Sequence, residues 1–412
     1  MGKLSRIYKN IPLVAQIAIG LIIGACLGLW VPEASFIKLF GEIFVGALKA
    51  IAPILVFVLV IASLSSAGQG IGKRFRTVIF FYMLSTFLAA AVAVIFSFAF
   101  PVKLPLTVTP DMELAPPAGL LEVFRTLLTN MVQNPISALM SANYVGILTW
   151  AVILGLALRK GATDGTKKVL SDISDAVSKV VGWVIRLAPL GIMGLVFTTV
   201  NENGLEIFTQ YGKILLVLVG CMLTVALFVN ALIVGVALRR NPFPLIFRCL
   251  RESGITAFFT RSSAANIPVN MSLCEKLGLE REYYSVAIPL GATINMDGAA
   301  ITITIMSLAA AFSQGVSVNF FTAIILSFVA TLGACGASGV AGGSLLLIPM
   351  ACSLLGIGQD IAMQVVAIGF VIGVVQDSLE TALNSSGDVL FCATAEYRDR
   401  MKKEKSQNNK NS

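Results

Sequence analysis

Long apolar runs dominate the chain and predict helices that cross a membrane. A run of about 20 apolar residues is long enough to span the hydrocarbon core of a bilayer as a helix. Six such runs come first, at residues 11–31, 38–67, 77–100, 144–159, 180–200 and 213–238. Pro53 and Pro189 lie inside the second and fifth runs, and we expect each to kink its helix rather than end it.

Polar residues then interrupt the apolar pattern between residues 243 and 276. The interruption covers residues 260–268 and contains Arg261, Ser262 and Ser263. Basic residues flank the segment on both sides, at Arg248, Arg251 and Lys276. Because Lys and Arg favour the cytoplasmic side of a membrane, the segment is expected to return to the side that it left. The pattern predicts a re-entrant helical hairpin whose serine-rich tip reaches into the membrane from the cytoplasm.

The remaining apolar runs also carry interruptions. A span at 284–311 is interrupted at 291–298 by Gly, Asn and Asp, which predicts locally unwound helix. The next segment, 318–357, is centred on a glycine-rich stretch at 333–343 and predicts a second hairpin, entering from the outside. A last span covers 361–394. This alternation of hairpins and interrupted helices suggests an inverted repeat, the arrangement in which secondary transporters bind their cargo near the membrane midplane.

A polar stripe lies within the last apolar span. Successive residues of a helix advance by about 100°, so side chains at i, i+3, i+4, i+7 and i+11 fall within an arc of roughly 100°. Five polar side chains have this spacing: Asp377, Glu380, Thr381, Asn384 and Asp388. Ionisable groups at membrane depth normally face a bundle interior or a wet cavity and mark the path of a substrate or ion. The stripe is therefore the first candidate site.

Composition and charge agree with a membrane protein that has no soluble domain. The 412 residues are 57% hydrophobic and 13% charged, and their mean hydropathy is +0.87. The net charge is +8, and Lys and Arg cluster in every second connection between spans rather than in one patch, which makes nucleic-acid binding a poor interpretation. Because basic residues favour the cytoplasmic side, both termini are expected in the cytoplasm. The polar tail after Glu396 is expected to be disordered. The chain has no His, so zinc chemistry and His proton relays lose support.

An excess of buried negative charge points to cations. Asp297, Asp377, Glu380 and Asp388 are predicted near the midplane, where Arg261 is the only basic residue expected. Carboxylates, Asn carbonyls and unwound backbone supply the oxygen ligands that hard cations prefer. The alternative for these acids is that basic side chains nearby neutralise them without any bound cation. The alternative for the serines and glycines of the two hairpins is a purely structural role in close helix packing.

The motifs resemble those of one known family. The resemblance rests on residues 260–263, Asn295-Met296-Asp297-Gly298, the glycine-rich stretch and residues 377–388, and it extends over the whole chain. These motifs are similar to those of the dicarboxylate/amino acid:cation symporters, the glutamate transporter family, and most similar to its bacterial sodium-coupled serine/threonine members. The resemblance implies an all-α fold with eight transmembrane helices, two re-entrant hairpins and inverted repeats.

The resemblance also implies a division of the single domain, residues 1–412. The expected scaffold comprises residues 11–67 and 144–200, and the expected transport core comprises 77–100 and 213–394. Residues 397–412 form a cytoplasmic tail, and the protein is expected to be a homotrimer in a bacterial inner membrane.

Site residues follow from the resemblance position by position. Two groups would enclose the substrate: Ser262 and Ser263 at the first tip, and Ser338, Gly339, Val340 and Gly342 at the second. Asp377 would hold the ammonium group and Asn384 the carboxylate. Three sodium ions are implied. Their ligands would be Gly291, Asn295, Asn384 and Asp388 for the first; Thr293, Ala334, Cys335 and Ala337 for the second; and Tyr82, Ser85, Thr86, Asn295 and Asp297 for the third.

Glu380 departs from the family pattern. Members that carry acidic substrates have an Arg here, which binds the second carboxylate of the substrate. The Glu380 carboxylate would instead repel the second carboxylate of such a substrate by several kcal/mol at an effective dielectric constant of about 20. Glu380 or Thr381 can accept a hydrogen bond from a serine or threonine hydroxyl, while pairing of Glu380 with Arg261 is the alternative. Ala299 stands where the family usually has a hydroxyl residue.

The motifs and the resemblance together predict sodium-driven symport of small neutral L-amino acids by an elevator-type alternating-access movement. Serine and threonine are the expected substrates. The nearest alternative is a sodium- or proton-coupled transporter of dicarboxylates such as glutamate and aspartate. An ion channel would conduct without substrate. A membrane-embedded enzyme would use Asp297 and Asp377 as a carboxylate pair. The lack of His argues against the enzyme, and we expect no catalytic residues.

Overall fold

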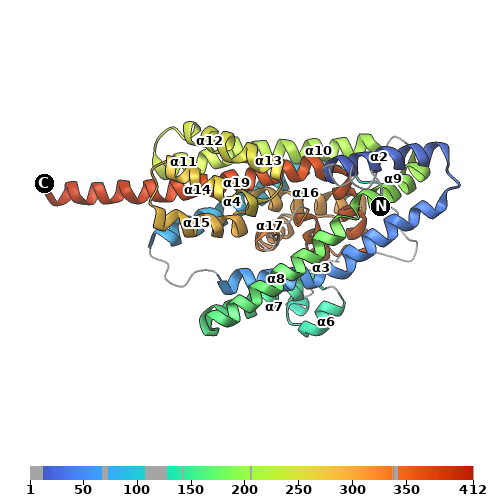
Figure 1. Cartoon of the computed structure of the whole chain (residues 1–412), viewed down its shortest axis with the longest axis horizontal. Helices are drawn as coiled ribbons and strands as arrows, with labels where there is room; N and C mark the ends of the chain where they lie inside the picture. The colour runs from blue at the N-terminus through green and yellow to red at the C-terminus, as the bar shows by residue number, and fades with distance from the viewer. Residues whose placement is uncertain are drawn as a thin grey trace, which may run out of the picture.

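The protein is helical throughout the part of the chain that the structure describes (Figure 1). This computed structural model describes residues 13–66, 73–106, 128–141, 143–204, 207–335, 337 and 342–411. The all-helical expectation is confirmed for these ranges, in which the apolar helices fit a polytopic membrane protein.

The first half of the chain forms mainly long helices, most of them at the positions of the apolar runs. They are α2 (Leu13–Trp30), η1 (Ser35–Ile37), α3 (Lys38–Ser66), α4 (Lys73–Ala99), α6 (Pro135–Met140), α7 (Tyr144–Gly161), α8 (Asp164–Ile185), α9 (Ala188–Asn203) and α10 (Ile207–Thr224). Pro53 lies inside the continuous helix α3, so it does not end that helix.

The second half is built from shorter pieces that end in one very long helix. They are η2 (Val225–Val229), α11 (Asn230–Leu238), α12 (Phe243–Cys249), η3 (Leu250–Gly254), α13 (Ile255–Thr260), α14 (Ser263–Lys276), α15 (Arg281–Ile294), α16 (Asp297–Ser313), α17 (Phe320–Ala334), η4 (Ser344–Leu347), α18 (Ile348–Leu354) and α19 (Gln359–Asn411). The elements η2 and η3 are π-helical turns, which occur mostly as single turns and frequently at functional sites.

Five segments are long and apolar enough to cross a membrane, judged over the described residues. They are Ser35–Ala62, Phe75–Ala99, Thr209–Leu238, Arg281–Ser313 and Gln359–Glu404. The helices α8 and α9 add a sixth if they count as one bent span.

The prediction at Pro189 is wrong. One kinked helix was expected over 180–200, but α8 ends at Ile185 and α9 begins at Ala188 with a bend of 50° between them. Pro189 lies in the first turn of α9. A proline is tolerated there because the first N–H groups of a helix have no intrahelical partner, so the break comes before the proline.

The prediction of a disordered tail is also wrong, because α19 continues to Asn411 as a helix that extends beyond the bundle (Figure 1). Two ion pairs at i,i+4 spacing support this extension: Glu396 with Arg400, and Asp399 with Lys403. Residues 397–412 include four Lys and two Arg, which are good helix formers. Local propensity therefore outweighs the low hydrophobicity on which the prediction rested.

Two sets of helices pack mainly within themselves. In the first set, α3 packs against α7, α8 and α9, and α2 lies along α9. Glycines allow this close approach, since a Cβ at Gly24 would lie 2.4 Å from the carbonyl oxygen of Met193. In the second set, α16 packs against α4, α17, α18 and α19 and is buried along nearly its whole length.

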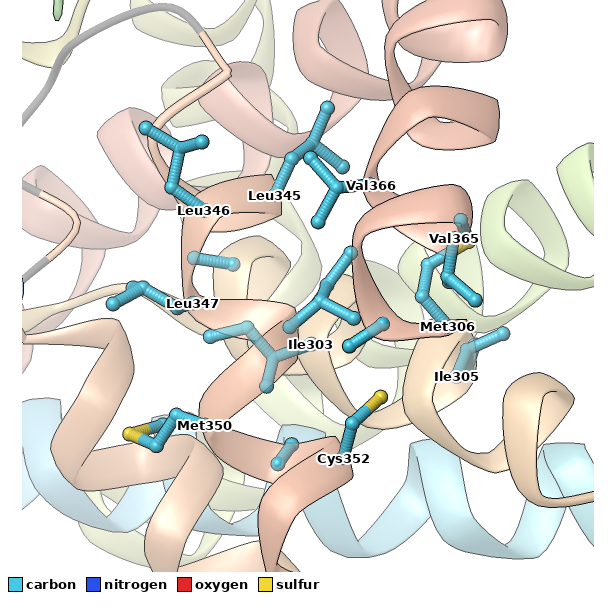
Figure 2. Close-up of a cluster of buried hydrophobic side chains, with 14 of the residues drawn as sticks. Ile303, Ile305, Met306, Leu345, Leu346, Leu347, Met350, Cys352, Val365 and Val366 are labelled. Atoms are coloured by element: carbon cyan, nitrogen blue, oxygen red, sulfur yellow. The ribbon is translucent and has the colours of Figure 1, made fainter. Parts of the chain in front are cut away.

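An apolar cluster joins α16 to η4, α18 and the first part of α19. Figure 2 shows side chains from α16, from η4 and α18, and from α19 that meet in one cluster: Ile303, Ile305, Met306, Leu345, Leu346, Leu347, Met350, Cys352, Val365 and Val366. Burial of such side chains favours a fixed arrangement of these four elements. The polar residues of α19 follow directly after this cluster in the sequence.

Candidate functional site

The polar stripe of α19 is buried, as its spacing predicts. Asp377, Glu380, Thr381, Asn384 and Asp388 are each at most 6% exposed. Four helices, α13, α14, α15 and α16, pack on α19. Five polar side chains without access to water need partners from these neighbours.

The first neighbour is a helical hairpin with its tip at Arg261 and Ser262. Arg261 has a left-handed backbone with φ 52°, and Ser262 caps α14 by accepting a hydrogen bond from the Ala265 N–H at 3.2 Å. The two arms run side by side, since Asn266 Nδ2 donates to the carbonyl oxygen of Ser253 at 3.2 Å. Ser263, the second predicted tip residue, is buried. The predicted break is confirmed at 261–262, although α14 already begins at residue 263.

The second neighbour is the break between α15 and α16. Asn295 and Met296 are not helical, which confirms the predicted unwinding. The Gly298 N–H donates to Asn384 Oδ1 at 2.7 Å, so α19 holds the start of α16. A Cβ at Gly298 would lie only 2.7 Å from the Glu380 Cα, so glycine permits this close crossing of α16 and α19.

Arg261 pairs with Asp377, and the alternative pairing with Glu380 is not formed. The guanidinium donates to Asp377 Oδ2 through Nε at 2.7 Å and through Nη2 at 2.6 Å. The Gly342 N–H donates to the other oxygen, Oδ1, at 3.2 Å. The Asp377 carboxylate therefore links both hairpin regions to α19. In the described part of the chain, Arg261 is the only basic side chain in an ion pair with any of the four buried acids.

Glu380 is held by neutral donors from three elements. Its Oε2 accepts hydrogen bonds from Thr302 Oγ1 at 2.7 Å, Ser344 Oγ at 2.8 Å and Gln376 Nε2 at 2.5 Å. Hydrogen bonds to a charged acceptor are stronger than those between neutral groups. Donors from α16, η4 and α19 thus fix this carboxylate in place without a countercharge.

Asn384 and Thr381 keep polar atoms free for a ligand. Asn384 Nδ2 points to the sulfur of Met296 at 3.4 Å, a weak acceptor that a carboxylate would readily replace. The Thr381 hydroxyl donates to the backbone oxygen of Asp377 at 2.7 Å, which leaves its own oxygen able to accept. The amide can therefore donate to a carboxylate, and the hydroxyl oxygen can accept from a hydroxyl group.

One predicted cation site gathers around Asp388. Asn295 Nδ2 donates to Asp388 Oδ1 at 3.1 Å and to the backbone oxygen of Asn384 at 3.0 Å. Asp388 Oδ2 is buried with no hydrogen-bond partner among the described residues. Gly291 lies beside it, since a Cβ there would come within 2.9 Å of Asp388 Oδ1. An unpaired carboxylate oxygen among carbonyl oxygens is a donor set that suits a hard cation.

A second predicted cation site gathers around Asp297. Its Oδ1 accepts from Ser85 Oγ at 2.8 Å and from Thr86 Oγ1 at 3.1 Å, and Ser85 Oγ also lies 3.1 Å from Asn295 Oδ1. Asp297 Oδ2 is buried and has no hydrogen-bond partner within the described ranges. The hydroxyl of Tyr82 lies elsewhere, where it donates to the backbone oxygen of Asp388 at 3.0 Å. The backbone oxygen of Tyr82 lies 3.1 Å from Ser85 Oγ and 2.9 Å from Thr86 Oγ1, so Tyr82 joins the two acidic centres.

The remaining predicted ligands lie where α15 approaches the end of α17. The Cys335 thiol is 3.7 Å from the carbonyl oxygen of Ile294, next to Thr293. The Thr293 hydroxyl donates to the Leu290 carbonyl at 2.7 Å, and the Ala334 carbonyl accepts from the Ala337 N–H at 2.9 Å. The predicted substrate contacts Ser338, Gly339 and Val340 lie outside the described residues.

Four buried polar residues at the site are absent from the sequence-based prediction. Three of them, Thr302, Ser344 and Gln376, bind Glu380, and the fourth, Asn230, lies beside Asp297 with its Oδ1 unpaired in the described structure. Asn230 has a readable signal because it is the single amide of the apolar run 213–238, and Gln376 has one because it directly precedes Asp377. Thr302 and Ser344 have none, because hydroxyl residues are common in membrane helices.

Comparison with known proteins adds independent findings. The sequence model of the sodium:dicarboxylate symporter family matches residues 13–397. A relative from Bifidobacterium adolescentis, named serine/threonine transporter SstT, is 58% identical over 404 residues, which cover 96% of this chain and 94% of the relative. A relative of the same name from Streptococcus agalactiae is 57% identical over 396 residues, covering 96% of this chain and 98% of the relative.

Proposed function

The chain belongs to the sodium:dicarboxylate symporter family, and from this premise we propose that it carries serine and threonine into the cell together with sodium. The protein is a transporter, as its relatives are, and not an enzyme. The main support for this substrate class is Glu380, a buried carboxylate at the position where the family's carriers of acidic substrates have an Arg. Three neutral donors hold this carboxylate in place.

Substrate recognition is assigned to α19 and the two hairpin regions. Asp377 binds the ammonium group of the amino acid, which shares this carboxylate with the guanidinium of Arg261. Asn384 donates its Nδ2 to the substrate carboxylate, and the N–H groups near Ser262 and Ser263 at the first tip add to this contact. Ser338, Gly339, Val340 and Gly342 cover the substrate from the second hairpin.

Selection for a hydroxyl side chain is assigned to Glu380 and Thr381. Both groups offer oxygen acceptors on the same face of α19. A glutamate or aspartate side chain would meet the Glu380 carboxylate in a region without a free cation, because Arg261 is already paired with Asp377. Like charges in such surroundings repel strongly. The same arrangement disfavours the alternative function, dicarboxylate transport.

Sodium ions are cargo that the acidic centres bind together with the substrate. Asp388, Asn295, Asn384 and Gly291 provide the first set of ligands, and Asp297, Ser85, Thr86, Asn295 and Tyr82 a further set, with another site between Thr293 and residues 334, 335 and 337. The unpaired oxygens of Asp388 and Asp297 support this assignment. The two centres share Asn295. Binding at one centre therefore orients a ligand of the other.

We further propose a topology of eight spans and two re-entrant hairpins with both termini in the cytoplasm of a bacterial cell. The hairpin around residue 261 supports the first re-entrant element. An ion pair between Glu252 and Lys276, 3.0 Å long, joins its two arms away from the tip, where charged groups would meet cytoplasmic water.

The two sets of packed helices support an elevator-type movement. Residues 11–67 and 144–200 form the scaffold, and residues 77–100 and 213–394 form the transport core. Helices of each set pack more extensively on one another than across the boundary. A core that moves as one body would carry both acidic centres with it. The scaffold would supply the contacts of a homotrimer.

Competition for uptake tests the proposed substrate class. The full-length protein is reconstituted in proteoliposomes with an inward sodium gradient, and uptake of labelled serine is measured against unlabelled serine, threonine, alanine, aspartate and glutamate. Serine and threonine should compete at the lowest concentrations, and the two acids should not compete. Equal competition by aspartate would exclude the assignment in favour of a dicarboxylate transporter.

A further inference from the structure

A hollow on the outer surface of the helix bundle lies where α4, α11 and α19 meet. Its volume is about 530 Å³. Twelve residues line it: Phe80, Phe81, Leu84, Leu88, Leu232, Ile233, Val236, Ala237, Arg239, Arg398, Met401 and Lys402. None of these belongs to the proposed substrate or sodium sites. The lining divides into a large apolar part and a smaller basic part.

The apolar part follows two helices side by side. On α4, Phe80, Leu84 and Leu88 have the spacing of one helix face, and on α11, Leu232 and Val236 do. Phe80 is 56% exposed, Leu232 65% and Val236 70%. The face of α4 from residue 80 to 88 is about 12 Å long at 1.5 Å per residue. A hydrocarbon chain of a lipid can lie along such a groove.

The basic part closes one end of the groove. Arg239 follows the last residue of α11 and has a left-handed backbone with φ 53°. Arg398 and Lys402 lie one turn apart on α19, and the Arg398 guanidinium is 5.7 Å from the ring centre of Phe81. Three cationic groups from two helices therefore converge on one hollow.

These three cations lack the acidic partners that their neighbours have. Arg400 and Lys403 of the same helix form ion pairs with Glu396 and Asp399. Within the described ranges, Arg239, Arg398 and Lys402 form no ion pair, and no acidic residue lines the hollow. A single basic residue near a membrane surface is ordinary. Three basic residues without acidic partners beside an apolar groove form a surface that matches an anion with a hydrocarbon chain.

We propose that this hollow binds one anionic phospholipid of the surrounding bilayer. The phosphate lies among Arg239, Arg398 and Lys402, and an acyl chain lies between the exposed faces of α4 and α11. Charge complementarity selects an anionic headgroup, and the apolar groove selects a lipid over a free anion. The bound lipid would tie the end of α11 to α19, the helix that carries Asp388.

Native mass spectrometry of the purified full-length protein measures this binding directly. Dioleoyl phosphatidylglycerol is titrated in mild detergent, with dioleoyl phosphatidylcholine and inorganic phosphate as separate probes. We expect saturable binding of phosphatidylglycerol, and binding weaker by about tenfold or more after combined Arg239→Gln, Arg398→Gln and Lys402→Gln substitution. Val236→Trp, which fills the groove and keeps all charges, should also weaken it.

The control removes three positive charges elsewhere. Lys160→Gln, Lys168→Gln and Lys179→Gln change exposed residues outside the hollow, and this variant should bind phosphatidylglycerol as the unmodified protein does. Equal weakening in the control would show that only net charge matters and would overturn the proposal. Equal affinity for phosphatidylcholine, or a shift produced by inorganic phosphate alone, would overturn it too.

Discussion

At the scale of single residues, Glu380 shows what the sequence can and cannot predict. Its place on the buried stripe of α19 follows from helical spacing alone. Its partners do not, because Thr302 and Ser344 come from α16 and η4, far away in the sequence. The pairing of Arg261 with Asp377 rather than Glu380 is likewise set by how the hairpin tip packs on α19.

Glu380→Arg should change the substrate preference. The new cation would bind a second carboxylate, while Thr302, Ser344 and Gln376 would lose their common acceptor. We expect aspartate to become a competitor of labelled serine at a concentration lower by about tenfold or more, and serine itself to bind more weakly. Glu380→Gln is the matched control, since it removes the repulsion without adding a cation. Unchanged specificity in Glu380→Arg would refute the role given to this residue.

Asp388→Asn should weaken sodium binding. The substitution keeps the shape of the side chain and removes the negative charge whose Oδ2 has no hydrogen-bond partner in the described structure. The sodium concentration for half-maximal serine uptake should rise by about tenfold or more, as loss of a buried charge–charge contact implies. Asp172→Asn, an exposed change on α8, is the control. A sodium dependence identical to that of the control would contradict the assignment.

At the scale of elements, the breaks in helices are the best predicted feature. Polar and glycine residues locate the interruptions at 261–262 and 295–296, because an exposed peptide group inside a membrane needs nearby polar partners. The tail and the α8–α9 break are mispredicted for opposite reasons. Local ion pairs stabilise a helix that hydropathy does not require, and a bend of 50° separates helices that hydropathy reads as one run.

Gly298→Ala should disturb the crossing of α16 and α19. The added methyl group would lie 2.7 Å from the Glu380 Cα and 2.8 Å from its carbonyl oxygen, so backbone must move. Overpacking of this kind costs about 1–3 kcal/mol, and we expect a lower melting temperature in detergent together with reduced serine uptake. Gly373→Ala on α19 is the control, because a Cβ there meets nothing within 4 Å. Equal melting temperatures for the two variants would argue against a tight crossing.

At the scale of the whole molecule, the two acidic centres and the stripe belong to one packed set of helices. Tyr82 and Asn295 connect Asp297 with Asp388, and Asp377 connects both hairpin regions with α19. In the proposed function, sodium and substrate would therefore bind to the same continuous network. The sequence indicates the members of this network by their polarity in apolar runs, whereas their contacts depend on packing between distant segments.

In the proposed function sodium drives serine uptake, and accumulation of serine in proteoliposomes measures this coupling. Vesicles with the full-length protein are loaded without sodium and diluted into medium that contains labelled serine and sodium, or choline or potassium in its place. We expect serine to accumulate above its outside concentration only with the inward sodium gradient, and an ionophore for sodium to abolish the accumulation. Equal uptake in choline or potassium would contradict it.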